Sequence, residues 1–242
     1  MKKELKYVVL SLMVLGLVFG SANMARALTV NTVDGAWLNA VPTGPSMYNP
    51  VITNGASPGV VDIVRWGQPV YWPQQSGYDF LAVTTPFDAV VDGSAFALGT
   101  FTHNNYPVYA PSLTSIDLDV ALSVYGFDSF TPRFHFTHDE TTNNASPDTN
   151  PANNDLVTLT NPTLNAQFSD GTNVYYFNLI GFSTDGGVTV KSFFSTVETQ
   201  SNIATLYARM TSSPITAPEP GTMLLLGLGL MGLAGVRRKI QK

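Results

Sequence analysis

Three histidines are the side chains in this sequence with the widest range of possible chemistry: His103, His135 and His138. Imidazoles bind transition metals and exchange protons near neutral pH. On an extended strand, however, His135 and His138 point to opposite faces, and no cysteine or His-x-His pair accompanies them. Structural roles are therefore favoured over zinc binding, and His103, which precedes Asn104 and Asn105, is expected to pin a loop by hydrogen bonds to its backbone.

Oxygen-bearing side chains gather directly after the third histidine. Hard cations such as Ca²⁺ bind several carboxylate and amide oxygens on flexible backbone. A calcium site is the hypothesis that this composition suggests, and a solvated acidic loop without an ion stays open as the alternative. The five candidate ligands are Asp139, Glu140, Asn143, Asn154 and Asp155.

Motifs for nucleophilic catalysis do not occur in the sequence. It has no cysteine and no Gly-x-Ser-x-Gly elbow, which removes the commonest hydrolase arrangements. A pair of carboxylates can cleave glycosides, but their separation decides this. We expect a protein that is not an enzyme, with a secreted carbohydrate-active hydrolase using acidic residues near His138 as the alternative.

Aromatic residues cluster around two prolines, at Trp66, Tyr71, Trp72 and Tyr78. Flat rings on a β-sheet surface stack on sugars, so an extracellular polysaccharide is a candidate partner. The same residues commonly fill a core. We assign Trp66 to the core and leave Trp72 open.

The elements that must position these residues are strands. Residues 116–124 alternate between apolar and mostly polar side chains, the period of a half-buried strand. Segments rich in β-branched and aromatic residues predict eight more strands, at 60–66, 78–84, 94–102, 133–137, 155–159, 174–182, 188–197 and 203–210.

Turn signals separate these strands and argue against helices. Asn-Gly or Asp-Gly pairs, which favour tight hairpins, stand at 54–55, 92–93, 170–171 and 185–186. Residues 141–154 are polar and aperiodic, which predicts a long surface loop. The pattern predicts an all-β fold, a single β-sandwich or jelly-roll-like domain over residues 28–214.

Both ends of the chain have the composition of targeting segments. Residues 1–27 contain three early lysines, an apolar run at 7–19 and the small-residue pattern Ala25-Arg26-Ala27. This indicates a signal peptide that is cut before Leu28, with an uncleaved anchor as the alternative. An exported domain without cysteine must rely on apolar burial for stability.

The charge of the body differs from that of the ends. Residues 28–220 hold four basic and 16 acidic side chains, an excess of 12 acidic residues. Nucleic-acid binding needs a basic surface, so we do not expect it. Divalent cations are the more natural partners.

The last segment, 215–242, carries a compact set of signals. Pro218-Glu219-Pro220 precedes an apolar run at 222–236, and the basic residues Arg237, Arg238 and Lys239 follow it. The apolar run is slightly short for a membrane span of about 20 residues. The basic tail is expected to stay in the cytoplasm, so the protein would be anchored in the inner membrane. A simple tail anchor is the alternative.

This C-terminal arrangement resembles the PEP-CTERM sorting signal of Gram-negative bacteria. The resemblance implies export, recognition by an exosortase in the membrane, cleavage near the Pro-Glu-Pro motif, and a final location at the cell surface or outside the cell. An association with exopolysaccharide or biofilm matrix fits that location.

Two blocks in the body resemble the THxN family of PEP-CTERM proteins, which is related to choice-of-anchor K domains. The first is Thr102-His103-x-Asn105 and the second is His138-x-Glu140-Thr141. Trp66-Gly67 and the stretch from Val197-Glu198 to Ala208-Arg209 add to the resemblance. Family members often carry cysteines after the second block, and this chain has none. The resemblance implies no assigned activity.

Overall fold

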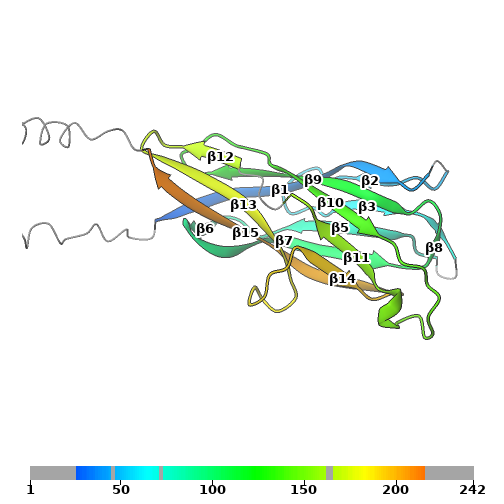
Figure 1. The fold of residues 1–242 in the computed structure, drawn as a ribbon. Coiled ribbons are helices and arrows are strands. Elements are labelled where there is room, and N and C mark those ends of the chain that lie inside the picture. The colour runs from blue at the N-terminus through cyan, green and yellow to red at the C-terminus, as the bar shows by residue number, and fades with distance from the viewer. Residues whose placement is uncertain (1–25, 45–46, 71–72, 162–165, 216–242) are drawn as a thin grey trace, which may run out of the picture.

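A computed structural model describes residues 26–44, 47–70, 73–161 and 166–215 (Figure 1). Most of the predicted signal peptide and the C-terminal sorting segment lie outside these residues, as do Tyr71 and Trp72. No helix within the described residues is long and apolar enough to cross a membrane.

The described body is almost entirely β-structure, arranged in two large sheets and one small one. In sheet order, the six-stranded sheet contains β14 (Phe193–Thr196), β11 (Asp155–Leu159), β10 (Arg133–Asp139), β9 (Leu113–Val124), β1 (Ala27–Pro42) and β6 (Phe87–Val90). The seven-stranded sheet contains β12 (Ala166–Ser169), β13 (Asn173–Ser183), β15 (Gln200–Pro214), β7 (Asp92–Asn105), β5 (Ser76–Ala82), β3 (Asp62–Trp66) and β2 (Val51–Thr53). The short pair is β4 (Gln68–Pro69) with β8 (Val108–Tyr109), and a 3₁₀ turn, η1, covers Pro151–Asn153.

One hydrophobic core joins the two large sheets. Alternate residues of β9 are fully buried, as the period-two pattern predicts. Aromatic rings meet across the core: Trp37 of β1 lies 5.8 Å from Tyr78 of β5, and Phe101 of β7 lies 5.9 Å from Phe136 of β10. Trp66 is completely buried, so its assignment to the core is confirmed. Two curled sheets that share a core fit the predicted β-sandwich.

The turns in the structure match the turns predicted from the sequence only in part. Asp170-Gly171 closes the β12–β13 hairpin as predicted. Asp92-Gly93 instead follows β6 in one sheet and begins β7 in the other, so it is not the tip of a hairpin. The strand expected over 188–197 shrinks to β14. The polar segment 141–154 is a connection, but it contains η1 and buries Asn153.

Both ends of the described body lie at the same end of an elongated molecule (Figure 1). Arg26 forms an ion pair with Asp170 at 2.8 Å, and the Ile215 N–H donates to the Thr172 carbonyl at 2.8 Å. Both contacts therefore use the turn between β12 and β13. At the opposite end, β7 and β10 finish while β11 and β15 begin (Figure 1). We call this the distal end.

Candidate functional site

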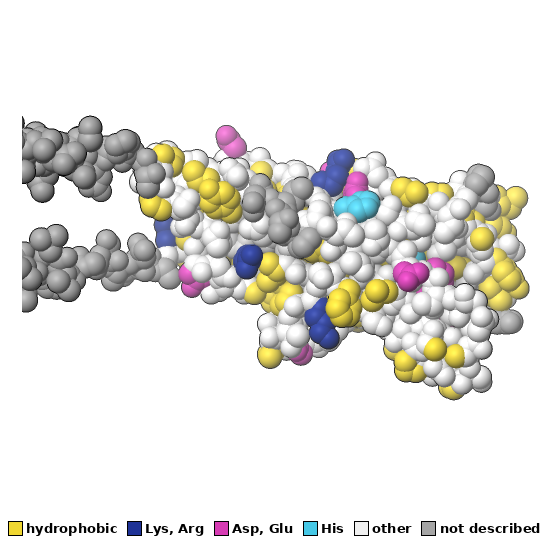
Figure 2. All heavy atoms as spheres, in the orientation of Figure 1, with side chains coloured by type: hydrophobic (Ala, Val, Ile, Leu, Met, Phe, Trp, Pro, Cys, Tyr) yellow, Lys and Arg dark blue, Asp and Glu magenta, His cyan; other side chains and the backbone are white. Residues whose placement is uncertain are grey.

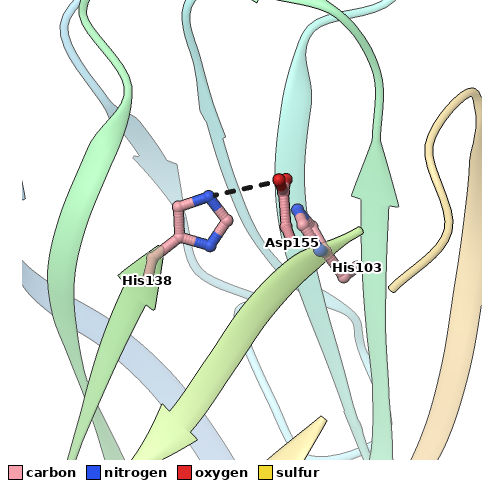
Figure 3. A group of neighbouring side chains, drawn as sticks. All are labelled: His103, His138 and Asp155. Atoms are coloured by element: carbon pink, nitrogen blue, oxygen red, sulfur yellow. Dashed lines mark ion pairs between the residues drawn. The ribbon is translucent and has the colours of Figure 1, made fainter. Parts of the chain in front are cut away.

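Three buried side chains meet at the distal end, between the two sheets. His103 comes from β7 of the seven-stranded sheet, while His138 and Asp155 come from β10 and β11 of the six-stranded sheet. Each occupies an inward position of its strand, so the alternation that builds the core also directs these polar groups inward. One donor atom from each residue lies within 4.8 Å of the others (Figure 3).

Both imidazoles are held by a hydroxyl group on one ring nitrogen. The Nδ1 atom of His138 lies 2.6 Å from the hydroxyl of Tyr78, and the Nδ1 atom of His103 lies 2.8 Å from the hydroxyl of Thr196. The Nε2 atom of His138 lies 3.3 Å from Glu140 Oε2 and 3.9 Å from Asp155 Oδ2. The anchored nitrogens fix both rings and leave the Nε2 atoms for the cluster.

Asp155 is likewise held by hydrogen bonds to only one of its two carboxylate oxygens. Its Oδ1 atom accepts hydrogen bonds from the backbone N–H of Thr141 at 2.9 Å and from the Thr141 hydroxyl at 3.2 Å. Its Oδ2 atom is buried and has no hydrogen-bond partner among the described residues. Thr141 therefore orients the carboxylate, and the second oxygen faces the cluster (Figure 3).

Further buried polar atoms around the cluster also lack hydrogen-bond partners within the described part of the chain. They are His103 Nε2 and Asn105 Oδ1. A buried polar group without a partner costs about 1–3 kcal/mol, and more when it is charged. Several such atoms at one place indicate a site and not a packing accident.

Carboxyl groups are concentrated at this end of the core. Burial, followed by the nearby carboxylate of Glu140, raises the pKa of Asp155 to about 9, although hydrogen bonds from Thr141 oppose the rise. Burial raises the pKa of Glu198 to about 7, again with a contribution from Glu140. Burial, followed by the neighbouring His138, lowers the pKa of His103 well below its ordinary value, so this ring is neutral. The carboxylates thus favour a bound cation, either a proton or a metal ion.

The described basic residues make their ion pairs elsewhere. Arg26 pairs with Asp170, Arg65 with Asp79 and Arg133 with Asp119. None of the described ion pairs brings a Lys or Arg to the cluster. On the face shown in Figure 2, Lys and Arg side chains are few and separated from one another.

Aromatic side chains enclose the two histidines. Trp66 stacks on His103 with ring centroids 5.9 Å apart, and its ring meets the edge of His138 at 5.3 Å. Tyr78 packs against both histidines. These apolar walls keep the local dielectric low, which strengthens every electrostatic interaction inside.

The five proposed calcium ligands do not form one group. Asp155 and Glu140 face the cluster, and Asn143, exposed in the connection after β10, interacts with Glu198 through its side chain. Asp139, in contrast, is exposed on β10, one position beyond the inward-facing His138. Asn154 precedes the inward-facing Asp155 and donates to Ser195 at 3.3 Å. Strand alternation separates adjacent residues onto opposite faces, which is why the loop residues split.

The remaining polar residues considered in the sequence analysis either lie on outward faces of the strands or make contacts other than those predicted. His135 is partly exposed, and its Nδ1 atom lies 2.6 Å from Asp117. Asp119 binds Arg133 through two hydrogen bonds. The ring of His103 contacts a threonine hydroxyl on another strand, so the expectation that it bonds to loop backbone was wrong.

The two sequence blocks therefore meet in space. His103 and Asn105 of the first block are buried beside His138, Glu140 and Thr141 of the second. Thr102 is the exception, because it occupies the opposite face of β7 from His103. Tyr78 and Thr196 complete the site, and no local pattern marks them as part of it. Glu198 also lies there, and it belongs to a stretch that carries the family resemblance.

The described residues form an all-β body with a buried polar cluster between its two large sheets. Beyond the body, residues 216–239 match the family model described as the PEP-CTERM protein-sorting motif. The motif indicates an exosortase-sorted surface protein, which is exported, anchored in the membrane before cleavage, and then delivered to the cell surface. No curated protein matches the chain.

Proposed function

We propose that the body is a non-enzymatic surface or extracellular-matrix protein that contacts exopolysaccharide once the exosortase has released it. The observation that carries the polysaccharide part is a surface groove of about 270 Å³ beside β14. Its lining combines aromatic and polar side chains: Phe182, Thr184, Asp185, Thr189, Lys191, Phe193, Phe194 and Ser195.

The groove has the chemistry of a sugar subsite. Phe193 is 44% exposed, and the Lys191 ammonium lies 5.5 Å from the centre of its ring. Asp185 accepts a hydrogen bond from the backbone of Thr189, which is the main reason that its pKa falls to about 2. An exposed ring bordered by hydroxyl and charged groups suits a sugar, which has apolar faces and polar edges.

Hydrolysis is the less favoured function at either place. A glycosidase needs two carboxyl groups on either side of an accessible bond. Among the described residues, Asp185 is the single carboxylate that lines the groove, and its low pKa makes it a poor proton donor. The carboxyl groups near His138 that have raised pKa values, Asp155 and Glu198, are fully buried.

A glycan array with the full chain tests the proposal. We expect binding to acidic or neutral polysaccharides, at least a tenfold loss with Phe193→Ala, and no loss with Tyr125→Ala, whose ring is 75% exposed on another part of the surface. A parallel assay for new reducing ends should stay at background. Failure of the wild type to bind any glycan, or equal losses in both variants, would contradict polysaccharide contact, and turnover would favour the hydrolase.

We also propose that the body belongs to the THxN family, related to choice-of-anchor K domains. The convergence of its two sequence blocks on one buried cluster supports this, since residues of a family motif commonly serve one structural or chemical purpose. A family profile built from the body alone should recover relatives in which the residues matching His103 and His138 are retained together.

A further inference from the structure

We propose that His103, His138 and Asp155 bind one zinc ion that joins the two sheets at the distal end of the sandwich. The starting observation is that each residue has one polar atom anchored by a neighbour and a second atom directed toward the other two (Figure 3). This inference concerns the core of the body and is independent of its polysaccharide partner.

Hydrogen bonds set His103 up as a neutral ligand. The Thr196 hydroxyl lies 2.8 Å from His103 Nδ1 and 3.4 Å from the Asp155 carbonyl. When its one proton goes to that carbonyl, its oxygen accepts the proton of His103 Nδ1. The lone pair of His103 then lies on Nε2, which is fully buried and has no partner among the described residues. A bare imidazole nitrogen in that position is the form that binds a metal.

The other two ligands have the same supporting contacts. Tyr78 holds Nδ1 of His138, and Thr141 holds Oδ1 of Asp155. Metal-binding histidines almost always donate their second ring nitrogen to an oxygen, which fixes the ring. All three residues therefore have the outer contacts that are typical of metal ligands, while their inner atoms converge.

Charge supports a divalent ion at this point. The carboxylates of Asp155, Glu140 and Glu198 lie close together, and no Lys or Arg pairs with them within the described residues. Buried carboxylates need a compensating cation. The neutral ring of His103 does not compensate the carboxylates, whereas a zinc ion would bring two positive charges.

The donor set selects zinc over calcium. Imidazole nitrogens suit Zn²⁺ and its neighbours in the first transition row, whereas Ca²⁺ prefers six to eight oxygens. Glu140 Oε2, 3.3 Å from His138 Nε2, can provide the fourth ligand of a closed tetrahedral site. Donors of tetrahedral zinc are about 3.4 Å apart, so loading draws together donor atoms that lie within 4.8 Å of one another.

The position of the ligands indicates a structural role. One ligand comes from the seven-stranded sheet and two come from the six-stranded sheet. The ion would therefore clamp the sheets, as a disulfide does in other exported domains. The chain has no cysteine, and a buried site with four protein ligands leaves no open position for catalysis.

Metal analysis and thermal unfolding of the full chain in detergent test the site directly. After dialysis against ZnCl₂ and then buffer, we expect one zinc per chain. Zinc at 100 times its dissociation constant should raise the melting temperature by at least about 5 °C. Chelation should reverse the shift, and CaCl₂ and MgCl₂ should not reproduce it.

Matched variants locate the ion. We expect His103→Asn and Asp155→Asn to lose the bound zinc and the zinc-dependent shift. His135→Asn, which changes the partly exposed histidine on β10, should retain both. The first two variants could fail to fold, so a second measurement uses the wild type with Co²⁺ in place of Zn²⁺. An intense visible absorption band of the bound Co²⁺ would report tetrahedral nitrogen and oxygen ligands. A folded wild type with no bound zinc, no thermal shift and no Co²⁺ band would overturn the proposal, as would loss of zinc in His135→Asn.

Discussion

The Tyr78 hydroxyl links the aromatic core to the buried cluster. It lies 2.6 Å from His138 Nδ1 inside a fully buried environment. Tyr78→Phe leaves that nitrogen without its partner, and we expect the free energy of unfolding to fall by about 1–3 kcal/mol. If zinc is bound, its affinity should fall about 10- to 100-fold, because the ring of His138 loses its orienting contact.

Urea unfolding and zinc titration measure these two effects. Tyr125→Phe is the control, because its ring is 75% exposed, and both quantities should stay unchanged. An unchanged zinc affinity in folded Tyr78→Phe would show that the hydroxyl does not orient the ligand.

Asp62 gives the protein a pH dependence that is independent of the cluster. Burial raises its pKa to about 6, and the charge of Asp34 adds to the increase although a hydrogen bond from Gly55 opposes it. The folded state therefore holds this proton up to higher pH than the unfolded chain does. The contribution of Asp62 to stability is largest below about pH 4 and falls as the pH rises to about 6.

Asp62→Asn removes the titrating proton and keeps an oxygen that can accept from the Gly55 N–H. Compared with the wild type, we expect a variant that is more stable at pH 7 by about 1–3 kcal/mol and no more stable at pH 4. Urea unfolding between pH 4 and 7.5 measures the difference. Exposed Asp128→Asn should keep the wild-type slope, and the same slope in Asp62→Asn would refute the assignment.

At the scale of residues, the sequence predicts the candidate site only where the alternation of side chains along one strand determines which face each residue occupies. Strand periodicity places His135 and His138 on opposite faces, and the structure confirms it. Tyr78 and Thr196 complete the site from other strands, 60 and 93 residues away from their histidines. Such partners are set by the packing of the sheets, which the spacing of residues along one strand does not encode.

At the scale of the strands, β1 approaches the opposite sheet closely at Gly35. A Cβ atom there would lie 2.6 Å from Asp62 Oδ2 and would overlap the ring of Phe80 on β5. We expect Gly35→Ala to lower the free energy of unfolding by about 1–3 kcal/mol, since overpacking forces a backbone or ring shift.

Thermal unfolding checks this close approach. Gly44→Ala is the matched control, because no described atom lies within 4 Å of an added Cβ. Equal melting temperatures for Gly35→Ala and the wild type would mean that the sheets can separate locally without cost.

Strand predictions succeeded where the pattern is regular. The alternation over 116–124 became most of β9, and the segment 155–159 coincides with β11. The longest strand, β1, was not predicted, because Gly35 and the left-handed Asn39 (φ 53°) interrupt its pattern. Its pairing with β9 and β6 supplies the hydrogen bonds that stabilise it despite these breaks.

At the scale of the whole molecule, the two ends of the described body lie together, at the end opposite to the buried cluster. Arg26 and Ile215 both contact the β12–β13 turn, while the buried cluster lies at the distal end (Figure 1). Anything that holds the chain through its sorting motif therefore leaves the distal end farthest from the attachment point.

The sorting motif makes a prediction about location. Replacing Pro218, Glu219 and Pro220 by alanine removes the residues that the exosortase is expected to recognise. We expect the variant to remain in the inner-membrane fraction at its uncleaved length, and loss of the exosortase in the producing cell should have the same effect. Normal surface delivery of the triple variant would show that sorting does not use this motif.

The predicted cleavage of the signal peptide, at the N-terminal end, would remove residues that take part in the described fold. A cut before Leu28 would remove Arg26 and Ala27, although Arg26 pairs with Asp170 and Ala27 pairs with Val90 in β1. Loss of the exposed ion pair should cost no more than about 1 kcal/mol. The cut would also remove the hydrogen bonds of Arg26 to the Tyr175 hydroxyl and to the Val91 N–H. The rest of the pairing of β1 with β6 and β9 stays in place, so we expect the body to remain folded.

The central claim is that the acidic β-structured body is exported and then sorted by its C-terminal motif. Intact-mass measurement of the protein recovered from the cell envelope and the medium tests it most directly, because one spectrum reports both ends. The account predicts a mass lacking residues 1–27 and the segment that follows the Pro-Glu-Pro motif. Recovery of the complete chain, Met1 to Lys242, from the cytosol would contradict it.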